Sequence, residues 1–101
     1  MDKLYYLLLE IREEPYKYLE RPTLKYLHSF MSGYIVYRNY IDREIHYDFY
    51  QGFSRYIQEK FQIYLSVSDM DIIEFFSTSE EEAFNRYFEL LDEYLELQGE
   101  K

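Results

Sequence analysis

Carboxylates recur along the last third of this sequence at spacings that place them on one side of a helix. Glu82, Glu89, Asp92, Glu93 and Glu96 are separated by three, four and seven residues. Paired carboxylates can serve acid–base catalysis if burial tunes their pKa values. On a solvated helix face such tuning is not expected, so these residues do not predict an enzyme.

Two other interpretations of the acidic side chains remain open. They are a solvated face that confers solubility, which composition alone favours, and a docking face for a basic partner. Two like-charge pairs, Glu89 with Glu93 and Asp92 with Glu96, each cost the helix about 0.2–0.5 kcal/mol. A soluble surface does not require like charges at this spacing. Their presence despite the repulsion is therefore the argument for a docking face.

The formal charge of −9 lies wholly in the same part of the chain. Residues 1–65 carry nine acids and nine bases, whereas residues 66–101 carry eleven acids and two bases. Nucleic-acid binding needs a basic face, and anionic membrane surfaces repel an acidic one. The charge therefore predicts neither partner and suits a basic protein instead.

Residues that could hold a metal or form a nucleophilic site are few. The sequence has no cysteine, and its two histidines, His28 and His46, fall in separate segments without metal-ligand spacing. Gly33 and Gly52 are isolated, so no phosphate-binding glycine loop is present. We expect no metal, no cofactor and no enzymatic activity.

The elements that would position these residues are helical. Three glycines and two prolines leave few tight turns, which argues against a β-sandwich or barrel. Apolar periodicity predicts one all-α domain over residues 1–101, a compact bundle of about five helices. They cover residues 3–13, 23–41, 47–62, a short stretch after Ser68, and 80–97, with a connector at 14–22. Residues 63–76 could form a hairpin instead of the short helix.

The 80–97 helix has the clearest signals. Ser79 and Glu82 have the spacing of a capping box, and Gly99 follows the end of the helix. Its apolar stripe comprises Phe84, Tyr87, Phe88, Leu91, Tyr94 and Leu95.

The 23–41 helix is apolar around most of its circumference, which predicts a central position in the bundle. Gly33 then predicts a close approach of a neighbouring backbone or ring. Arg38 falls within the apolar arc, so we expect a partly buried guanidinium paired with a carboxylate such as Glu74 or Asp92.

Tyrosine is unusually frequent, with fourteen residues. Six of them have no obvious core position: Tyr5, Tyr16, Tyr18, Tyr47, Tyr50 and Tyr64. Because tyrosine is enriched at interface hot spots, the connector bearing Tyr16 and Tyr18 is a second candidate binding surface.

No apolar run approaches the roughly 20 residues that span a bilayer. The run at residues 4–9 lacks the basic start and the cleavage site of a signal peptide. We expect a cytoplasmic protein.

A Pro-x-x-Tyr-Leu turn and a following Phe-x-x-Gly-Tyr pattern occur here as Pro15, Tyr18, Leu19, Phe30, Gly33 and Tyr34. The aromatic pattern extends to Phe53-Ser54-x-Tyr56-Ile57, to residues 71–75 and to the final helix. It resembles small bacterial cytosolic immunity proteins of polymorphic-toxin systems. The resemblance implies a protein that binds and neutralises a cognate toxin inside the producing cell.

The expected function is thus a non-enzymatic protein-binding module, an immunity protein for a toxin with a basic binding face. The alternative is a small helical regulatory or interaction protein that acts as a homodimer. The predicted partner-binding residues are Glu82, Glu89, Asp92, Glu93, Glu96, Tyr16 and Tyr18.

Overall fold

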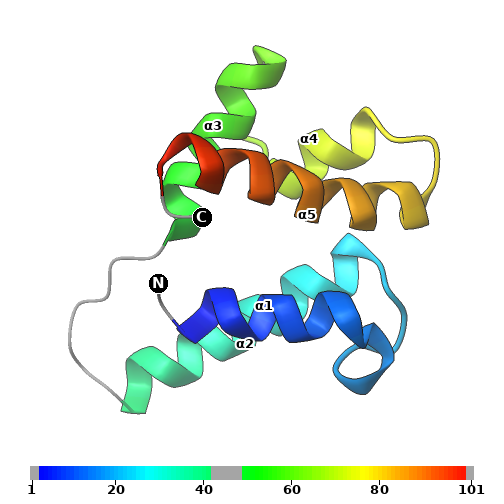
Figure 1. The fold of residues 1–101 in the computed structure, drawn as a ribbon, viewed down its shortest axis with the longest axis vertical. Coiled ribbons are helices and arrows are strands. Elements are labelled where there is room, and N and C mark those ends of the chain that lie inside the picture. Colours follow the sequence, from blue (N-terminus) through cyan, green and yellow to red (C-terminus); the bar gives the residue numbers. More distant parts are fainter. Residues whose placement is uncertain (1–2, 42–48, 100–101) are drawn as a thin grey trace.

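A computed structural model describes residues 3–41 and 49–99 of the chain (Figure 1). The elements are α1 (Lys3–Glu13), the short 3₁₀-helix η1 (Pro15–Lys17), α2 (Leu24–Ile41), α3 (Phe49–Phe61), α4 (Asp69–Phe75) and α5 (Glu80–Leu97). The described ranges contain no strand, so the all-α class is confirmed and the hairpin alternative for 63–76 is wrong. Tyr47, the expected start of the third helix, lies outside the described residues.

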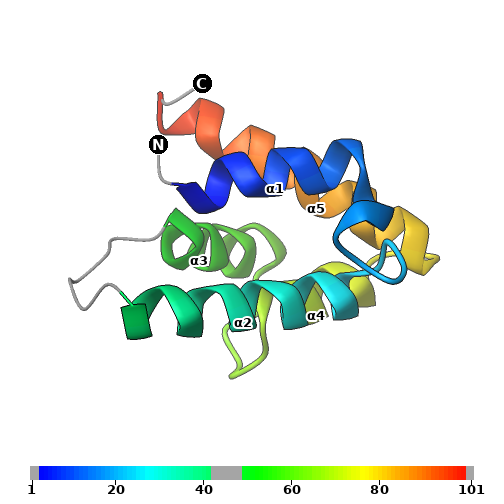
Figure 2. The ribbon, with the colours of Figure 1, turned by 90° about the horizontal axis from the view of Figure 1, so that it is seen from below.

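The helices lie in two groups in Figure 1. α1 and α2 run along the lower side, while α3 and α4 pack with α5 above them, and α3 crosses α5 steeply. The view from below shows α1 and α5 running along each other (Figure 2). A second contact joins the groups where α2 meets α4 and α5.

α5 contributes most to the core. Its buried residues include all six of the predicted stripe, together with two more: Ala83, Phe84, Tyr87, Phe88, Leu90, Leu91, Tyr94 and Leu95. The ring of Phe53 on α3 lies 5.3 Å from Tyr87 and 5.8 Å from Tyr94, centroid to centroid. Such ring pairs add to the stabilisation that burial alone gives.

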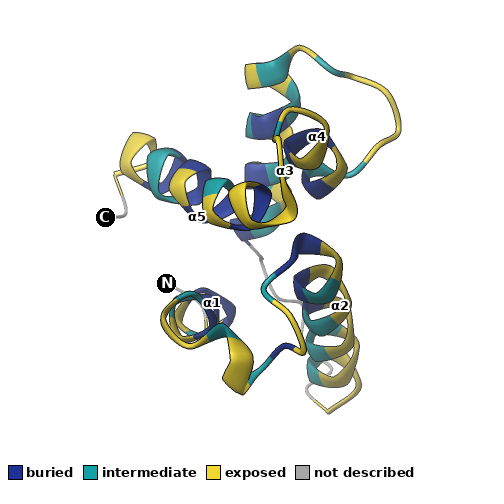
Figure 3. Ribbon diagram, turned by 90° about the vertical axis from the view of Figure 1, so that its right-hand side faces the viewer, coloured by how far each residue is buried: buried dark blue, intermediate teal, exposed yellow. Residues whose placement is uncertain are grey.

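α2 is not the central helix that its composition predicts. Its fully buried residues, Leu24, Leu27 and Met31, all lie in its first half. The second half exposes a set of large apolar side chains: Val36, Tyr37, Tyr40 and Ile41. Length contributes to this exposure, because α2 has 18 residues and α4, one of the helices that it meets, has 7. At 1.5 Å per residue these are about 27 Å and about 10 Å, so α4 cannot cover all of α2. Figure 3 shows α2 largely teal and yellow beyond its first turns.

Two further expectations for α2 have different outcomes. No atom lies within 4 Å of where a Cβ on Gly33 would stand, so the predicted close approach is wrong. Arg38 is half-buried, as predicted, with its Cζ 6.0 Å from the centroid of the Tyr34 ring. Its Nη2 lies 3.5 Å from Asn39 Oδ1. The carboxylate partner stays a prediction.

Candidate partner-binding surface

The start of α5 fixes the position of Glu82. Ser79 Oγ accepts a hydrogen bond from the Glu82 N–H at 3.0 Å, which is the predicted cap. In a capping box the Glu82 carboxylate would accept from the N–H of Ser79, but here it bonds the preceding residue, Thr78. It accepts from the Thr78 hydroxyl at 2.6 Å and from the Thr78 N–H at 3.3 Å. These bonds lower the pKa of Glu82 and tie its charge to the helix end.

Asp92 and Glu93 connect α5 to the helices on its two flanks. Asp92 Oδ2 lies 2.8 Å from Arg12 Nη1 on α1. Glu93 Oε2 lies 2.9 Å from Lys60 Nζ on α3 and accepts a hydrogen bond from the Tyr56 hydroxyl. The Tyr56 bond and then the Lys60 contacts lower the pKa of Glu93. Both carboxylates are therefore paired across helix–helix contacts within the fold.

Three other carboxylates of α5 are exposed and available. Among residues 3–41 and 49–99, none forms a hydrogen bond or ion pair with the carboxylates of Glu81, Glu89 or Glu96. The predicted acidic face thus divides in two. Glu82, Asp92 and Glu93 are paired within the fold, while Glu89 and Glu96, together with Glu81, face solvent.

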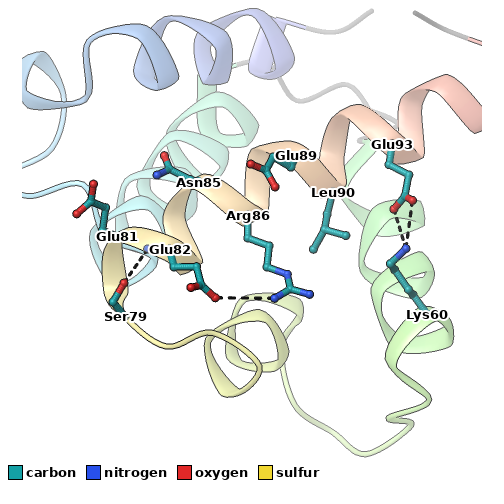
Figure 4. Close-up of a pocket in the computed structure, with 9 residues that line it drawn as sticks. All are labelled: Lys60, Ser79, Glu81, Glu82, Asn85, Arg86, Glu89, Leu90 and Glu93. Carbon is teal, nitrogen blue, oxygen red and sulfur yellow. Dashed lines mark hydrogen bonds and ion pairs between the residues drawn. The ribbon is translucent and has the colours of Figure 1, made fainter.

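A hollow of about 760 Å³ lies along this side of α5 (Figure 4). Lys60 of α3 borders one end, where it pairs with Glu93, and Ser79 borders the other. Between them Leu90 supplies apolar surface and Arg86 reaches toward Glu82, with Nη1 3.9 Å from Oε1. The lining is mixed in charge, with an excess of carboxylates that includes Glu81 and Glu89.

Tyr16 lies on a second hollow that adjoins the first. This hollow, about 450 Å³, runs from the connector to the start of α5, and Glu81 and Asn85 line both hollows. Arg21 pins the connector there, with Nη2 3.3 Å from Glu80 Oε2. The Tyr16 side chain is 73% exposed. The acidic helix face and the Tyr16 end of the connector, which the sequence presents as separate candidates, are therefore parts of one surface.

Tyr18 does not share that surface. Its hydroxyl donates a hydrogen bond to Glu10 Oε2 at 2.6 Å, and its ring lies 6.0 Å from that of Phe30. It borders a different hollow, formed with α1. Tyr5, which has no obvious core position in the sequence, is buried with its ring 6.1 Å from Phe49.

Sequence reasoning did not predict six of the residues that line the first hollow, namely Lys60, Ser79, Glu81, Asn85, Arg86 and Leu90. Acids in the first turn of a helix suit the helix dipole, so Glu81 has a local explanation and does not by itself indicate a binding surface. A usable signal was present, because Glu81, Asn85, Glu89 and Glu93 follow at steps of four residues. Lys60 comes from another helix and has no such signal.

The described ranges contain no group of three or more metal-binding side chains placed to hold an ion. His46 lies outside these ranges. Of the helices within them, none is long and apolar enough to cross a bilayer.

Comparison with protein-family models, curated proteins and solved structures finds no match for this chain. The functional argument therefore rests on the surface of α5 and on the sequence.

Proposed function

We propose that this protein binds a basic partner protein through the exposed face of α5 and neutralises it, as an immunity protein neutralises its cognate toxin. The observation that supports this most directly is the trio of carboxylates at Glu81, Glu89 and Glu96. They are exposed and have no partner in the described chain, whereas their neighbours on the same helix are paired. An amphipathic helix places its charged residues on the solvent side in any case, so the proposal rests on these three carboxylates lacking a partner and not on the side that they share.

The mechanism follows from charge. A negative helix face steers a basic protein toward it and raises the association rate. If the partner is a nuclease, the carboxylates occupy the site that otherwise binds phosphate. The resemblance to immunity proteins of polymorphic-toxin systems supports this choice of partner.

A homodimer is the second candidate, and one observation favours it. The second half of α2 exposes Val36, Tyr37, Tyr40 and Ile41, each at 62–70% of its full accessibility. Two copies could bury these side chains against each other in an isologous contact. The mass of the protein in solution, measured across a range of concentrations, distinguishes this candidate from a monomeric inhibitor.

The test first asks whether a secreted toxin is encoded beside the gene, and then uses the full chain and that toxin domain, inactivated at its catalytic site. The triple variant Glu81→Gln, Glu89→Gln, Glu96→Gln removes the three available charges and leaves Asp92 and Glu93 in their ion pairs. The matched control is Glu13→Gln, Asp71→Asn, Glu74→Gln, which removes the same charge from exposed positions on α1 and α4.

We expect the α5 variant to lose about tenfold or more in association rate at low salt, and the control variant to lose much less. The difference between them should shrink as salt is raised, because the Debye length falls to about 8 Å at physiological ionic strength. Equal rates for the two variants would contradict the α5 face. Failure of the toxin domain to bind the wild-type chain would overturn the proposed function.

A further inference from the structure

Three phenylalanine rings form an exposed aromatic ledge, defined here as Phe61, Phe75 and Phe76. The rings of Phe61 and Phe76 stack at 4.9 Å with an interplanar angle of 21°. Phe75 meets Phe76 edge to face at 5.1 Å. The ledge therefore joins the end of α3 to the end of α4.

Phe61 is half-buried against the core, whereas the other two rings of the ledge are exposed. Phe75 is 79% exposed and Phe76 is 42% exposed. Just beyond Phe61, the connection to α4 exposes two more large apolar side chains, Tyr64 and Leu65, at 70% and 73%. Single exposed apolar residues are ordinary, but contiguous ones mark surfaces that other molecules cover.

Arg86 places the ledge beside the hollow of α5. Its Nη1 donates a hydrogen bond to the Phe76 carbonyl oxygen at 3.2 Å, and its Cζ lies 5.9 Å from the centroid of Phe61. The same side chain lines the hollow, with Nη1 3.9 Å from Glu82 Oε1 (Figure 4). An apolar platform and a hollow of mixed charge, with more carboxylates than bases, therefore meet at Arg86.

We propose that the ledge and the hollow form a two-part docking site for a basic protein. An apolar side chain of the partner covers Phe75, and an adjacent arginine or lysine enters the hollow toward Glu89. This inference rests on the proposed function and deepens it by naming the residues that supply affinity. Charge steers the encounter, whereas a desolvated aromatic contact slows dissociation.

Charge complementarity decides between a basic partner and a second copy of this chain. An isologous contact centred on the ledge would bring the α5 hollow of one copy close to that of the other. Glu81, Glu82 and Glu89 of both copies would then face like charges, which disfavours that pairing. The exposed half of α2 lacks such a cluster, so a homodimer would use α2 and not the ledge.

The first measurement selects peptides from a displayed library of random dodecapeptides against the immobilised full chain. We expect the enriched peptides to carry an apolar residue within a few positions of arginine or lysine. Peptides without basic residues, or no enrichment at all, would overturn the proposal.

The second measurement takes the most enriched peptide, made synthetically, and determines its Kd for a set of variants. Phe75→Ala should weaken binding about thirtyfold, as truncation of a central aromatic contact does. Phe75→Lys should weaken it at least as much, because it also adds a like charge. Tyr37→Ala removes an exposed aromatic side chain from α2 and should leave Kd within about twofold, as peripheral truncations do.

Circular dichroism establishes that each variant is folded, and either Phe75 variant suffices if the other does not fold. A peptide whose Kd is unchanged in a folded Phe75 variant contradicts the ledge. The same variants are then measured against the toxin domain. If the toxin binds and Phe75→Ala has no effect, the ledge is wrong and the proposed function stands. If the toxin does not bind while the peptides behave as expected, the proposed function is wrong and the docking site stands.

Discussion

The Tyr56 hydroxyl donates a hydrogen bond to Glu93 Oε2 at 2.5 Å, and the same oxygen lies 2.9 Å from Lys60 Nζ. One carboxylate on α5 thus receives two donors from α3, one neutral and one charged. The contact lies where α5 crosses α3, close to Tyr94, whose ring is 5.4 Å from that of Tyr56.

The first prediction concerns acid stability. The pKa of Glu93 is lower in the folded chain than its ordinary value of 4.5. Ionised Glu93 therefore stabilises the folded state at every pH above 4.5. That contribution is lost as pH falls through the lowered pKa. Glu93→Gln should reduce the free energy of unfolding at pH 7, and its difference from the wild type should narrow below about pH 4. Urea denaturation at several pH values measures this.

Glu89→Gln is the control, because the Glu89 carboxylate has no partner in the described ranges. Its free energy of unfolding should stay close to that of the wild type across the series. A Glu93→Gln deficit that is the same at pH 3 and pH 7 would contradict the assignment to ionisation.

The second prediction concerns alkaline pH. Burial, together with the Glu93 bond, raises the pKa of Tyr56 to about 12, and burial raises the pKa of Tyr87. The neutral Tyr56 hydroxyl stabilises the folded state fully at a pH below 10, the pKa of tyrosine in the unfolded chain. This stabilisation is lost as the pH rises toward about 12, the pKa of Tyr56 in the folded chain. Ultraviolet titration of the tyrosines should therefore show a late fraction, defined as the tyrosines that ionise only well above pH 10.

Tyr56→Phe and Tyr87→Phe should each remove part of this late fraction while the protein remains folded. Tyr87→Phe should also change stability by less than about 1 kcal/mol, since within residues 3–41 and 49–99 its hydroxyl contacts only the weak acceptor Met31 Sδ, at 3.9 Å. Tyr18 and Tyr26 also have raised pKa values, so some late ionisation should remain. A late fraction of undiminished size after both substitutions would show that Tyr56 and Tyr87 do not contribute to it.

The third prediction separates charge from packing at Arg12. Its guanidinium pairs with Asp92 and also lies 5.6 Å from the centroid of the Phe88 ring. Arg12→Ala removes both contacts and should cost about 1–2 kcal/mol. Asp92→Asn removes only the charge and should cost less than about 1 kcal/mol. A double-mutant cycle, measured by thermal or urea unfolding, gives the coupling free energy between Arg12 and Asp92. Equal losses of stability in the two single variants would show that the Phe88 contact contributes nothing.

The fourth prediction tests the cap of α5. Ser79→Ala leaves the Glu82 N–H without its acceptor and should destabilise the protein by about 1 kcal/mol, whereas Ser79→Gly should cost only a few tenths. Ser66→Ala, in the exposed connection before α4, is the control and should be neutral. The melting temperature reports all three, and a neutral Ser79→Ala would mean that water replaces the cap.

The helices could be predicted from the sequence because their signals are local. Ser68 and Ser79 cap α4 and α5 as their spacing indicates, and the six-residue stripe of α5 is wholly buried. The position of each helix in the bundle is not a local property. The apolar circumference of α2 indicates which of its residues could be buried. How many are buried depends on the helices that it meets, of which α4 is short.

The candidate site was predictable only in part, for a similar reason. A helical projection places Asp92 and Glu93 on the same side as Glu89. It cannot show that Arg12 lies on one flank and Lys60 on the other, 80 and 33 residues away in the chain. The long-range pairs decide which carboxylates remain available, and the ledge at Phe75 likewise depends on where α4 ends against α3.

The placement of the core on α5 has a consequence for synthesis on the ribosome. The core residues of α1, such as Leu4, Leu8 and Ile11, are fully buried, yet the helix that completes this core lies some 80 residues later. A nascent chain therefore has no stable fold to adopt until residue 95 has emerged from the exit tunnel. Until then Leu4, Leu8 and Ile11 stay open to chaperones and proteases. Quality control of this protein would thus act mainly before α5 is in place.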